Sequence, residues 1–336
     1  MTRARLLRRW APVLWIAAVA SSGVAAEGLL ILHKADSSLG FYSAAGKLEK
    51  RVPVNQHPHE MVISPDGRLA YTTDNGTMRI EQAGTGGNTV SIIDLEKREK
   101  VGEISTGDFR RPHGIAWIAR TGQLLVSTEL PDKLLLIDPR TRAIVKKFDT
   151  QGKTAHMVTV DAKGDWAFVS NSSSANVSAI NLETGDVTLI PTGPRPEGSV
   201  LSPDGKWLYV CQRDSSGIAM IDTATRKLVR TLDSGKGPVR IDVTPDGRHV
   251  VYGLLDERAV GWTDTRSGKV SGRVELPAAL GQIVSLHLSH DGRTAYAANE
   301  NMHRAYAIDL KAKRLKQEFQ LEGVMGPDPV MEQPHH

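Results

Sequence analysis

The sequence predicts an all-β fold, a seven-bladed β-propeller with four antiparallel strands in each blade and a last blade built from both ends of the chain. Similar segments recur at intervals of 54, 43, 41, 42, 45 and 44 residues, which is the spacing of four-stranded propeller blades. Each segment repeats one order of short apolar runs and turns, and the runs are rich in β-branched residues. Such runs are typical of strands rather than helices.

Each repeat opens with an apolar run that leads to a tight turn. In such a turn proline presets one backbone angle and glycine accepts the positive φ that follows. The sequence Pro-Asp-Gly stands at 65–67, 203–205 and 245–247, and a variant of it stands at 290–292. We therefore expect the first strand of each blade just before these turns. The seven repeats begin at Pro58, Pro112, Ala155, Pro196, Pro238, Ile283 and Pro327.

Three further strands are expected in each repeat. The second is apolar and often aromatic, as at 69–72 and 207–210, and the third ends in aspartate, as at 90–94 and 218–222. A short turn then leads to a polar fourth strand, for example 227–232. Runs of this length, bounded by turn residues, favour strands, and no convincing amphipathic helix pattern interrupts them.

The two ends of the chain are expected to share the seventh blade. The seventh repeat begins at Pro327, and residues 327–336 suffice for one strand only. Apolar runs at 29–32, 39–42 and 48–52 offer the three missing strands. This arrangement joins the ring without leaving an open sheet edge.

Residues 1–26 are predicted to be a secretory signal peptide. Residues 1–10 hold four arginines and no acid, an apolar run follows at 11–20, and small residues precede the expected cleavage after Ala26. These are the three parts of a signal peptide, and the apolar run is too short to span a bilayer in the mature protein; an uncleaved anchor is the alternative. We therefore expect the propeller to occupy 27–336, in the periplasm or secreted, with no membrane span after cleavage.

Charge and cysteine content exclude several classes of function. The formal net charge is +4, and removal of the four arginines of the signal peptide brings it to 0. No basic run remains that could follow a phosphate backbone, so we expect no nucleic-acid partner. The single cysteine, Cys211, excludes an internal disulfide, a zinc site built from cysteines and c-type haem attachment. We expect a monomer.

The second position of each repeat carries the strongest functional signal. The first strand of a propeller blade lines the central channel, so this position should recur around one axis. Its residues are, in chain order, His59, His113, His156, Glu197, Val239, Val284 and Asp328. Three imidazoles that converge with one or two carboxylates suit a divalent transition metal such as Zn, Cu, Fe or Mn. We call these seven positions the ring.

Several roles are open to the ring and its neighbours. Glu197 is expected as a fourth metal ligand or a general base, with Asp328 as support; alternatively, the ring only satisfies polar backbone at a wet channel mouth. Arg213 and Arg240 are expected to bind an anionic group near the ring, as part of the catalytic set. The long loop 76–88, which explains the first spacing of 54 residues, could close over the channel.

The repeats also carry a family resemblance. Units of the form Ser-Pro-Asp-Gly, as at 64–67 and 202–205, followed by an apolar-Tyr-Val run and a later Ile-Asp, resemble the YVTN-type β-propeller repeats of the cytochrome d1-like and surface-layer propeller superfamily. The resemblance covers nearly all of 27–336 and implies the fold. It says little about function, because relatives include haem proteins, lactonases and binding modules. Haem-bearing relatives need a basic cleft, and this chain has no concentrated Arg/Lys set.

The sequence therefore leaves three functions open. The first is an exported propeller that binds a divalent metal or a small ligand at one mouth of the channel through its His/Glu ring. The second is a lactonase-like hydrolase or a lyase that uses the same histidines and Glu197 for acid–base work. The third is an interaction scaffold without chemistry, with a protein partner on the channel face.

Overall fold

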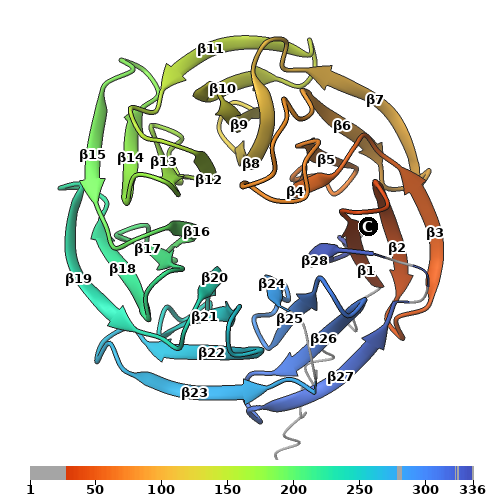
Figure 1. Ribbon diagram of the computed structural model, residues 1–336, viewed down its shortest axis with the longest axis vertical. Coiled ribbons are helices and arrows are strands. Elements are labelled where there is room, and N and C mark those ends of the chain that lie inside the picture. Colours follow the sequence, from red (N-terminus) through yellow and green to blue (C-terminus); the bar gives the residue numbers. More distant parts are fainter. Residues whose placement is uncertain (1–27, 278–281, 322, 324, 335–336) are drawn as a thin grey trace, which may run out of the picture.

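The computed structural model describes residues 28–277, 282–321, 323 and 325–334. Throughout these residues the regular structure is β, and the strands form seven four-stranded antiparallel sheets arranged as a ring (Figure 1). The predicted seven-bladed propeller is confirmed. The predicted signal peptide lies outside the described residues. A helix suited to crossing a membrane is not found in the part of the chain that the structure describes.

Each blade is ordered from the axis outwards in the order of the chain, apart from the seventh. The innermost strands are β4 (Pro58–Ile63), β8 (Arg110–Ile118), β12 (Ala155–Val160), β16 (Pro196–Leu201), β20 (Pro238–Val243), β24 (Ile283–Leu288) and β28 (Pro327–Glu332). The second strands are β5 (Leu69–Asp74), β9 (Gln123–Leu130), β13 (Trp166–Asn171), β17 (Trp207–Gln212), β21 (His249–Leu254), β25 (Thr294–Asn299) and β1 (Gly28–His33). Antiparallel neighbours need only short connections, which explains this order.

The outer half of each blade completes the sheet. The third strands are β6 (Thr89–Asp94), β10 (Asp132–Asp138), β14 (Asn176–Asn181), β18 (Gly217–Asp222), β22 (Ala259–Asp264), β26 (Arg304–Asp309) and β2 (Ser38–Ser43). The outermost strands are β7 (Glu99–Ser105), β11 (Ala143–Asp149), β15 (Val187–Pro191), β19 (Lys227–Asp233), β23 (Val270–Glu275), β27 (Arg314–Gln320) and β3 (Leu48–Pro53).

The seventh blade joins the two ends of the chain. Its strand order is β28-β1-β2-β3, and β28 pairs antiparallel with β1, with Met331 opposite Leu30 and Val330 opposite Ile31. The expected closure is therefore confirmed. The innermost strand of this blade comes from the C-terminal part of the chain, so this ladder ties the two ends of the chain together.

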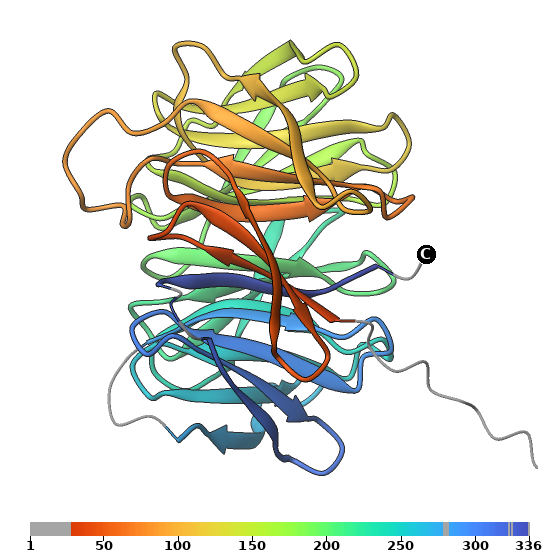
Figure 2. The same cartoon turned by 90° about the vertical axis from the view of Figure 1, so that its right-hand side faces the viewer.

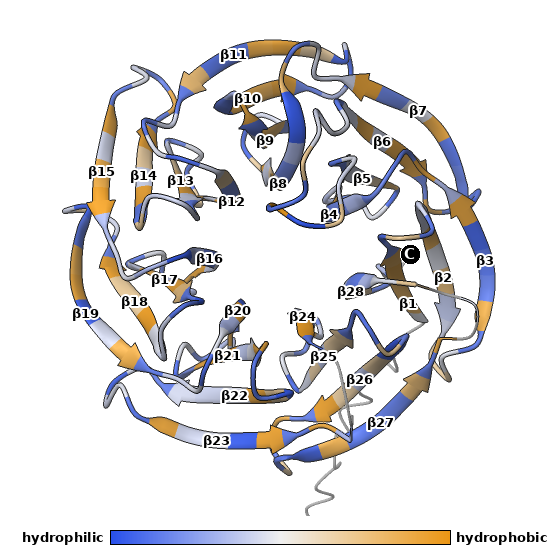
Figure 3. Ribbon diagram, viewed as in Figure 1, coloured by the Kyte–Doolittle hydropathy of each residue, from blue (hydrophilic) through white to orange (hydrophobic). Residues whose placement is uncertain are grey.

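The core lies between neighbouring blades rather than in one central mass. Seven clusters of buried apolar side chains each join two adjacent sheets, and one of them brings Tyr71 and Ile92 of the first blade against Leu124 and Leu135 of the second. Three outermost strands, β7, β11 and β27, alternate between exposed and less exposed residues, and Figure 3 shows changes of colour along the outer strands. The middle strands are apolar on both faces because each is covered on both sides.

Small residues in the inner strands let neighbouring blades approach closely. A Cβ atom on Gly114 of β8 would lie 2.5 Å from the carbonyl oxygen of His156 and 2.7 Å from the backbone nitrogen of Val158, both in β12. Such contacts with backbone cannot be relieved by a rotamer change. Gly114 therefore sets how near β8 and β12 come to each other at the axis.

Substitution of Gly114 by alanine should separate these two blades. We expect Gly114→Ala to lower the free energy of unfolding by about 1–3 kcal/mol, as overpacking against rigid neighbours does, measured by urea denaturation. Gly102→Ala in β7 is the matched control, because its added Cβ meets only the tip of the Arg142 side chain, which can move. Equal stability of the two variants would contradict the proposed role of Gly114.

Candidate functional site

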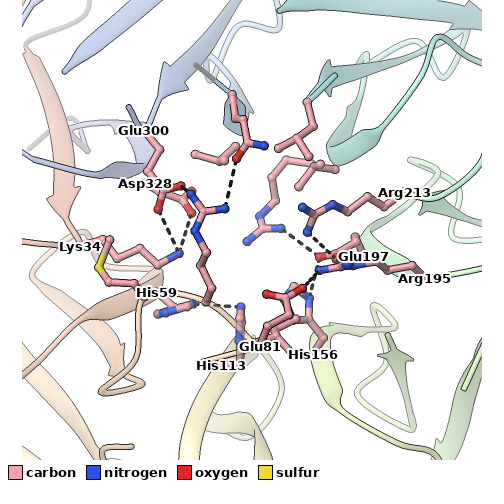
Figure 4. A pocket seen from close by; sticks show the side chains of 18 residues that line it. Lys34, His59, Glu81, His113, His156, Arg195, Glu197, Arg213, Glu300 and Asp328 are labelled. Carbon is pink, nitrogen blue, oxygen red and sulfur yellow. Dashed lines mark hydrogen bonds and ion pairs between the residues drawn. The ribbon is translucent and has the colours of Figure 1, made fainter. Parts of the chain in front are cut away.

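The seven ring residues line one cavity at a mouth of the channel. The cavity has a volume of about 70 Å³, and every blade contributes its ring residue to the wall. Other polar side chains complete it, and Figure 4 shows them directed toward a common centre. The geometric basis of the proposed site is therefore present. The ligand and catalytic roles expected for its residues stay predictions.

A β-bulge near the start of each inner strand changes the direction in which these side chains point. In the first blade the ladder between β4 and β5 becomes regular only at Met61, so His59 and Glu60 lie in the irregular part. The other six inner strands have the same irregularity near their start. A bulge breaks the strict alternation of faces along a strand. Consecutive residues such as Val239 and Arg240 can therefore both line the cavity.

Hydroxyl groups from preceding blades hold the backbone of two ring histidines. Thr73 in β5 donates to the carbonyl oxygen of His113 over 2.6 Å. Ser127 in β9 donates in the same way to the carbonyl oxygen of His156. Both hydroxyls are buried, where an unpaired carbonyl would be costly. The second strand of one blade thus positions the ring residue of the next.

Two histidines form the centre of a hydrogen-bonded chain. His59 Nε2 lies 2.6 Å from the carbonyl oxygen of Thr77, and His113 Nδ1 lies 2.6 Å from a carboxylate oxygen of Glu129. The Thr77 carbonyl oxygen can only accept a hydrogen bond, and the Glu129 carboxylate can only accept one when it is ionised. Each imidazole therefore donates an N–H to its oxygen. When both rings are neutral, their single N–H groups are therefore used at the two ends. His59 Nδ1 and His113 Nε2, which are 3.3 Å apart, then face each other with lone pairs.

Facing lone pairs at this distance repel each other unless a positive species lies between them. A shared proton satisfies the pair by turning one ring into an imidazolium, and a metal ion satisfies it by binding both nitrogens. Burial is the main reason why the pKa of His59 lies well below its usual value. The His59 ring is therefore neutral near pH 7.

The third histidine packs on the second. The rings of His113 and His156 lie with centroids 3.8 Å apart and planes inclined at 44°. The pKa of His156 is also far below normal, chiefly through burial, so this ring is neutral near pH 7. Among the described residues, no group of three or more His, Cys, Asp or Glu side chains is arranged to hold a metal ion.

Glu197 is surrounded by arginines instead of standing free. One of its oxygens lies 3.2 Å from Arg195 and 3.4 Å from Arg213, and the other lies 3.9 Å from Arg240. His156 Nδ1 is 3.3 Å from this second oxygen. Arg240 also forms a buried ion pair with Glu60, which reaches it from the first blade. These pairs compete directly with the metal-ligand or base role expected for Glu197.

A second ionic group lies on the other side of the cavity. The ammonium group of Lys34 is 3.8 Å from both Glu300 and Asp328. Burial raises the pKa of Asp328 to about 7, although Arg240 and Lys34 oppose the shift. Asp328 can therefore gain or lose a proton near neutral pH. It is better suited to acid–base chemistry than the arginine-bound Glu197.

The long loop 76–88 covers this mouth. Met78, Arg79, Ile80 and Glu81 from this loop line the cavity, and the loop projects from one face of the ring in Figure 2. Its two sides are tied to different blades, since Arg79 pairs with Glu300 at 3.6 Å and Glu81 with Arg195 at 2.5 Å. The expectation that the loop closes over the channel agrees with this arrangement.

Arg111 binds the loop 76–88 through its backbone carbonyl groups. Its guanidinium group donates to the carbonyl oxygens of Ile80, Gln82 and Gly84 and lies 3.6 Å from Glu129. Glu129 is also the carboxylate that accepts from His113. The loop and the histidine chain are therefore connected through one carboxylate.

Four buried polar atoms of the cavity wall have no hydrogen-bond partner in the described structure. They belong to side chains with at most 7% of their surface exposed: His156 Nδ1, Arg240 Nε, Glu300 Oε1 and Asp328 Oδ1. Each such atom costs about 1–3 kcal/mol if nothing pairs with it. The wall therefore has both donors and acceptors available for a ligand or water.

Sequence reasoning found the ring but missed several of its neighbours. Lys34, Glu60, Arg111 and Arg195 carry much of the charge of the site. Arg111 and Arg195 stand just before the opening proline of their repeats, where both have positive φ, and a comparison of that position across repeats could have singled them out. Cys211 lies in the apolar cluster between two blades.

Comparisons with known proteins bear on the fold. No family model matches the sequence. The uncharacterized protein YncE of Salmonella typhimurium is 23% identical over 154 residues, which are 45% of this chain and 41% of YncE. The seven-bladed beta-propeller protein Rv1057 of Mycobacterium tuberculosis is 29% identical over 131 residues, 37% of this chain and 33% of Rv1057. The matches thus span less than half the length of these relatives.

Solved structures include further propellers of this shape. The dihydro-heme d1 dehydrogenase NirN in complex with DHE has a TM-score of 0.66 and 14% identity, with 93% of this chain and 76% of NirN covered. At this identity the likeness concerns the fold alone.

Asp328 should make stability depend on pH in a defined direction. Its pKa is about 7 in the folded protein and about 3.9 in an unfolded chain, so the folded state holds the extra proton between these values. Its contribution to stability therefore falls as the pH rises from about 4 to about 7. We expect the free energy of unfolding of the wild type, minus that of Asp328→Asn, to decrease over this range by up to ~1.4 kcal/mol per pH unit.

Urea titrations between pH 5 and pH 7 measure this difference. Asp66→Asn is the control, because a hydrogen bond from Ser64 lowers the pKa of Asp66; this carboxyl is ionised in both states between pH 5 and pH 7, so its wild-type-minus-variant difference should stay constant. A wild-type-minus-variant difference for Asp328 that stays constant or rises with pH would contradict the assignment.

Proposed function

We propose that this YVTN-type seven-bladed β-propeller binds a small polar ligand in the loop-covered cavity, and that it does so after export to the periplasm or the medium. The observation that carries the proposal is the set of buried, unpartnered polar atoms on the cavity wall. Without a ligand, only water would pair with the buried donors and acceptors that the seven blades bring together. The signal-peptide pattern of residues 1–26 supports export.

Acid–base chemistry on that ligand would be an extension of binding. The pKa of Asp328 near 7 favours a proton transfer at neutral pH, which suits a hydrolase or a lyase. The catalytic roles expected for Glu197, Arg213 and Arg240 then become substrate positioning: guanidinium groups hold an anionic part of the substrate while Asp328 exchanges a proton.

A thermal-shift screen tests the binding function. Small carboxylates, amino acids, polyols and phosphate are offered to the mature protein at millimolar concentration, and at least one class should raise Tm in a saturable way. His156→Phe keeps an aromatic ring against His113 but removes both nitrogens, so we expect it to lose most of the shift. Arg98→Gln, in a surface pair with Glu49, should keep it. A flat response to every class in folded protein would refute the proposal.

A divalent transition metal is the second candidate for this site, and the His59–His113 pair favours it. A tetrahedral zinc ion with Zn–N bonds of about 2.0–2.1 Å holds neighbouring nitrogens about 3.3 Å apart, the same as the observed separation. Each ring donates its other N–H to an oxygen, of Glu129 or Thr77, as metal-bound histidines commonly do. Of the expected metals, Zn, Cu and Fe suit such nitrogen donors better than Mn, which prefers oxygen ligands; water would complete the shell.

Elemental analysis of protein prepared from the periplasm tests the metal candidate. We expect about one metal ion per chain in the wild type and a loss of at least tenfold in a His59→Gln, His113→Gln double variant. His290→Gln, at an exposed position elsewhere, is the control and should keep the metal. Equal, substoichiometric metal in all three proteins would eliminate this candidate, and an optical spectrum would separate copper from zinc.

A further inference from the structure

The cavity has two unlike polar walls on opposite sides. On one wall Arg195, Arg213 and Arg240 surround the single carboxylate of Glu197, as Figure 4 shows for three of these residues. Arg195 also pairs with Glu81, and Arg240 with Glu60, but these carboxylates leave the buried Arg240 Nε without a partner. This wall therefore has a hydrogen-bond donor on a cationic group that no side chain accepts from. We call it the donor wall.

The facing wall has buried acceptor oxygens that lack a hydrogen-bond donor. Here Glu300 and Asp328 share the ammonium group of Lys34, which lies 3.8 Å from each, and Glu300 also lies 3.6 Å from Arg79. Glu300 Oε1 and Asp328 Oδ1 are buried and accept no hydrogen bond. In Figure 4 Lys34, Glu300 and Asp328 lie across the cavity from Arg213 and Glu197. We call this the acceptor wall, because its free atoms are oxygens.

The size of the cavity limits what can join the two walls. The cavity is small, about 70 Å³, yet larger than one buried water requires. Its size therefore favours a small molecule as the occupant.

We propose that the cavity selects small bipolar acids, in which a carboxylate and a hydroxyl or ammonium donor are separated by one or two carbon atoms. The carboxylate binds the donor wall through Arg213 and Arg240, and the hydroxyl or ammonium group donates to Glu300 and Asp328. This inference rests on the proposed function, since it names the ligand class of the same cavity. Glycolate and glycine have the required groups and size.

Each simpler ligand satisfies only part of the site. An inorganic anion or acetate pairs with the donor wall but leaves the oxygens of Glu300 and Asp328 without a donor. A neutral diol reaches both walls but brings no negative charge to the arginines. A divalent cation is attracted to the acceptor wall and repelled by the donor wall. In this series only a bipolar acid brings a charged acceptor to the donor wall and a donor to the acceptor wall. Charge-assisted hydrogen bonds of this kind are stronger than neutral ones.

Calorimetric titration with matched probes tests the proposal on the wild-type protein. Glycolate and glycine should bind at least about tenfold tighter than acetate, which lacks the donor, and than ethylene glycol, which lacks the carboxylate; tenfold corresponds to about 1.4 kcal/mol. Zinc chloride is titrated in parallel. Because this comparison uses unmodified protein, it does not depend on the folding of any variant.

Two variants assign the walls. Glu300→Met removes acceptor oxygens but keeps a side chain of similar length, so glycolate should fall to the affinity of acetate while acetate itself is unchanged. Arg213→Met on the donor wall should weaken glycolate and acetate alike. Arg98→Gln on the surface should change neither. Circular dichroism and Tm confirm that each variant is folded.

The outcomes separate this inference from the function on which it rests. If acetate or ethylene glycol binds as tightly as glycolate and glycine, the bipolar selection is wrong, while ligand binding in the cavity stands. If only zinc binds, the selection is also wrong and the metal candidate gains support. If no probe binds, the selection is wrong, and the thermal-shift screen of the wider ligand classes decides whether the proposed function fails with it.

Discussion

Everything at the channel mouth depends on the ladder between β28 and β1. This pairing fastens the C-terminal strand into the N-terminal blade and turns a row of seven sheets into a closed ring. Closure forces the inner strands together at the axis, where only small side chains such as Gly114 allow backbone to approach backbone. The close contact between the tilted rings of His113 and His156 is a consequence, since the strands that carry them can come no closer and cannot drift apart.

The charges at this mouth are organised by the same closure. Arg240 and Glu60 belong to blades on different sides of the ring, yet they form a buried ion pair. A pair of this kind is costly to desolvate and is weak evidence for added stability. Its effect here is positional, because it holds the Arg240 guanidinium over the cavity and lets one nitrogen remain without a partner. Function and packing are therefore linked through residues that no single blade could place.

The convergence of the seven ring residues, His59 and its counterparts in the other blades, could be predicted from the sequence. One position per repeat must recur around the axis of a closed propeller. The partners of the ring residues could not be predicted. The inner strands contain bulges, so Glu60 and Arg240, which strict alternation would turn away, also reach the site. Glu197 was expected to be available as a ligand or base, and the arginines around it come from loops and strands whose side-chain directions the repeat pattern does not specify.

The sequence by itself determined the blade count, the strand order, the shared last blade and the ring position, since these follow from the spacing of short apolar runs and turn residues. Tertiary structure decided which charges meet. Ion pairs depend on distances of a few ångströms between side chains from different blades, and burial shifts the pKa of a residue such as Asp328 only once the surrounding strands have excluded water. A one-dimensional pattern has neither the distances nor the exclusion of water, so the pairing of the site appears only when the ring has closed.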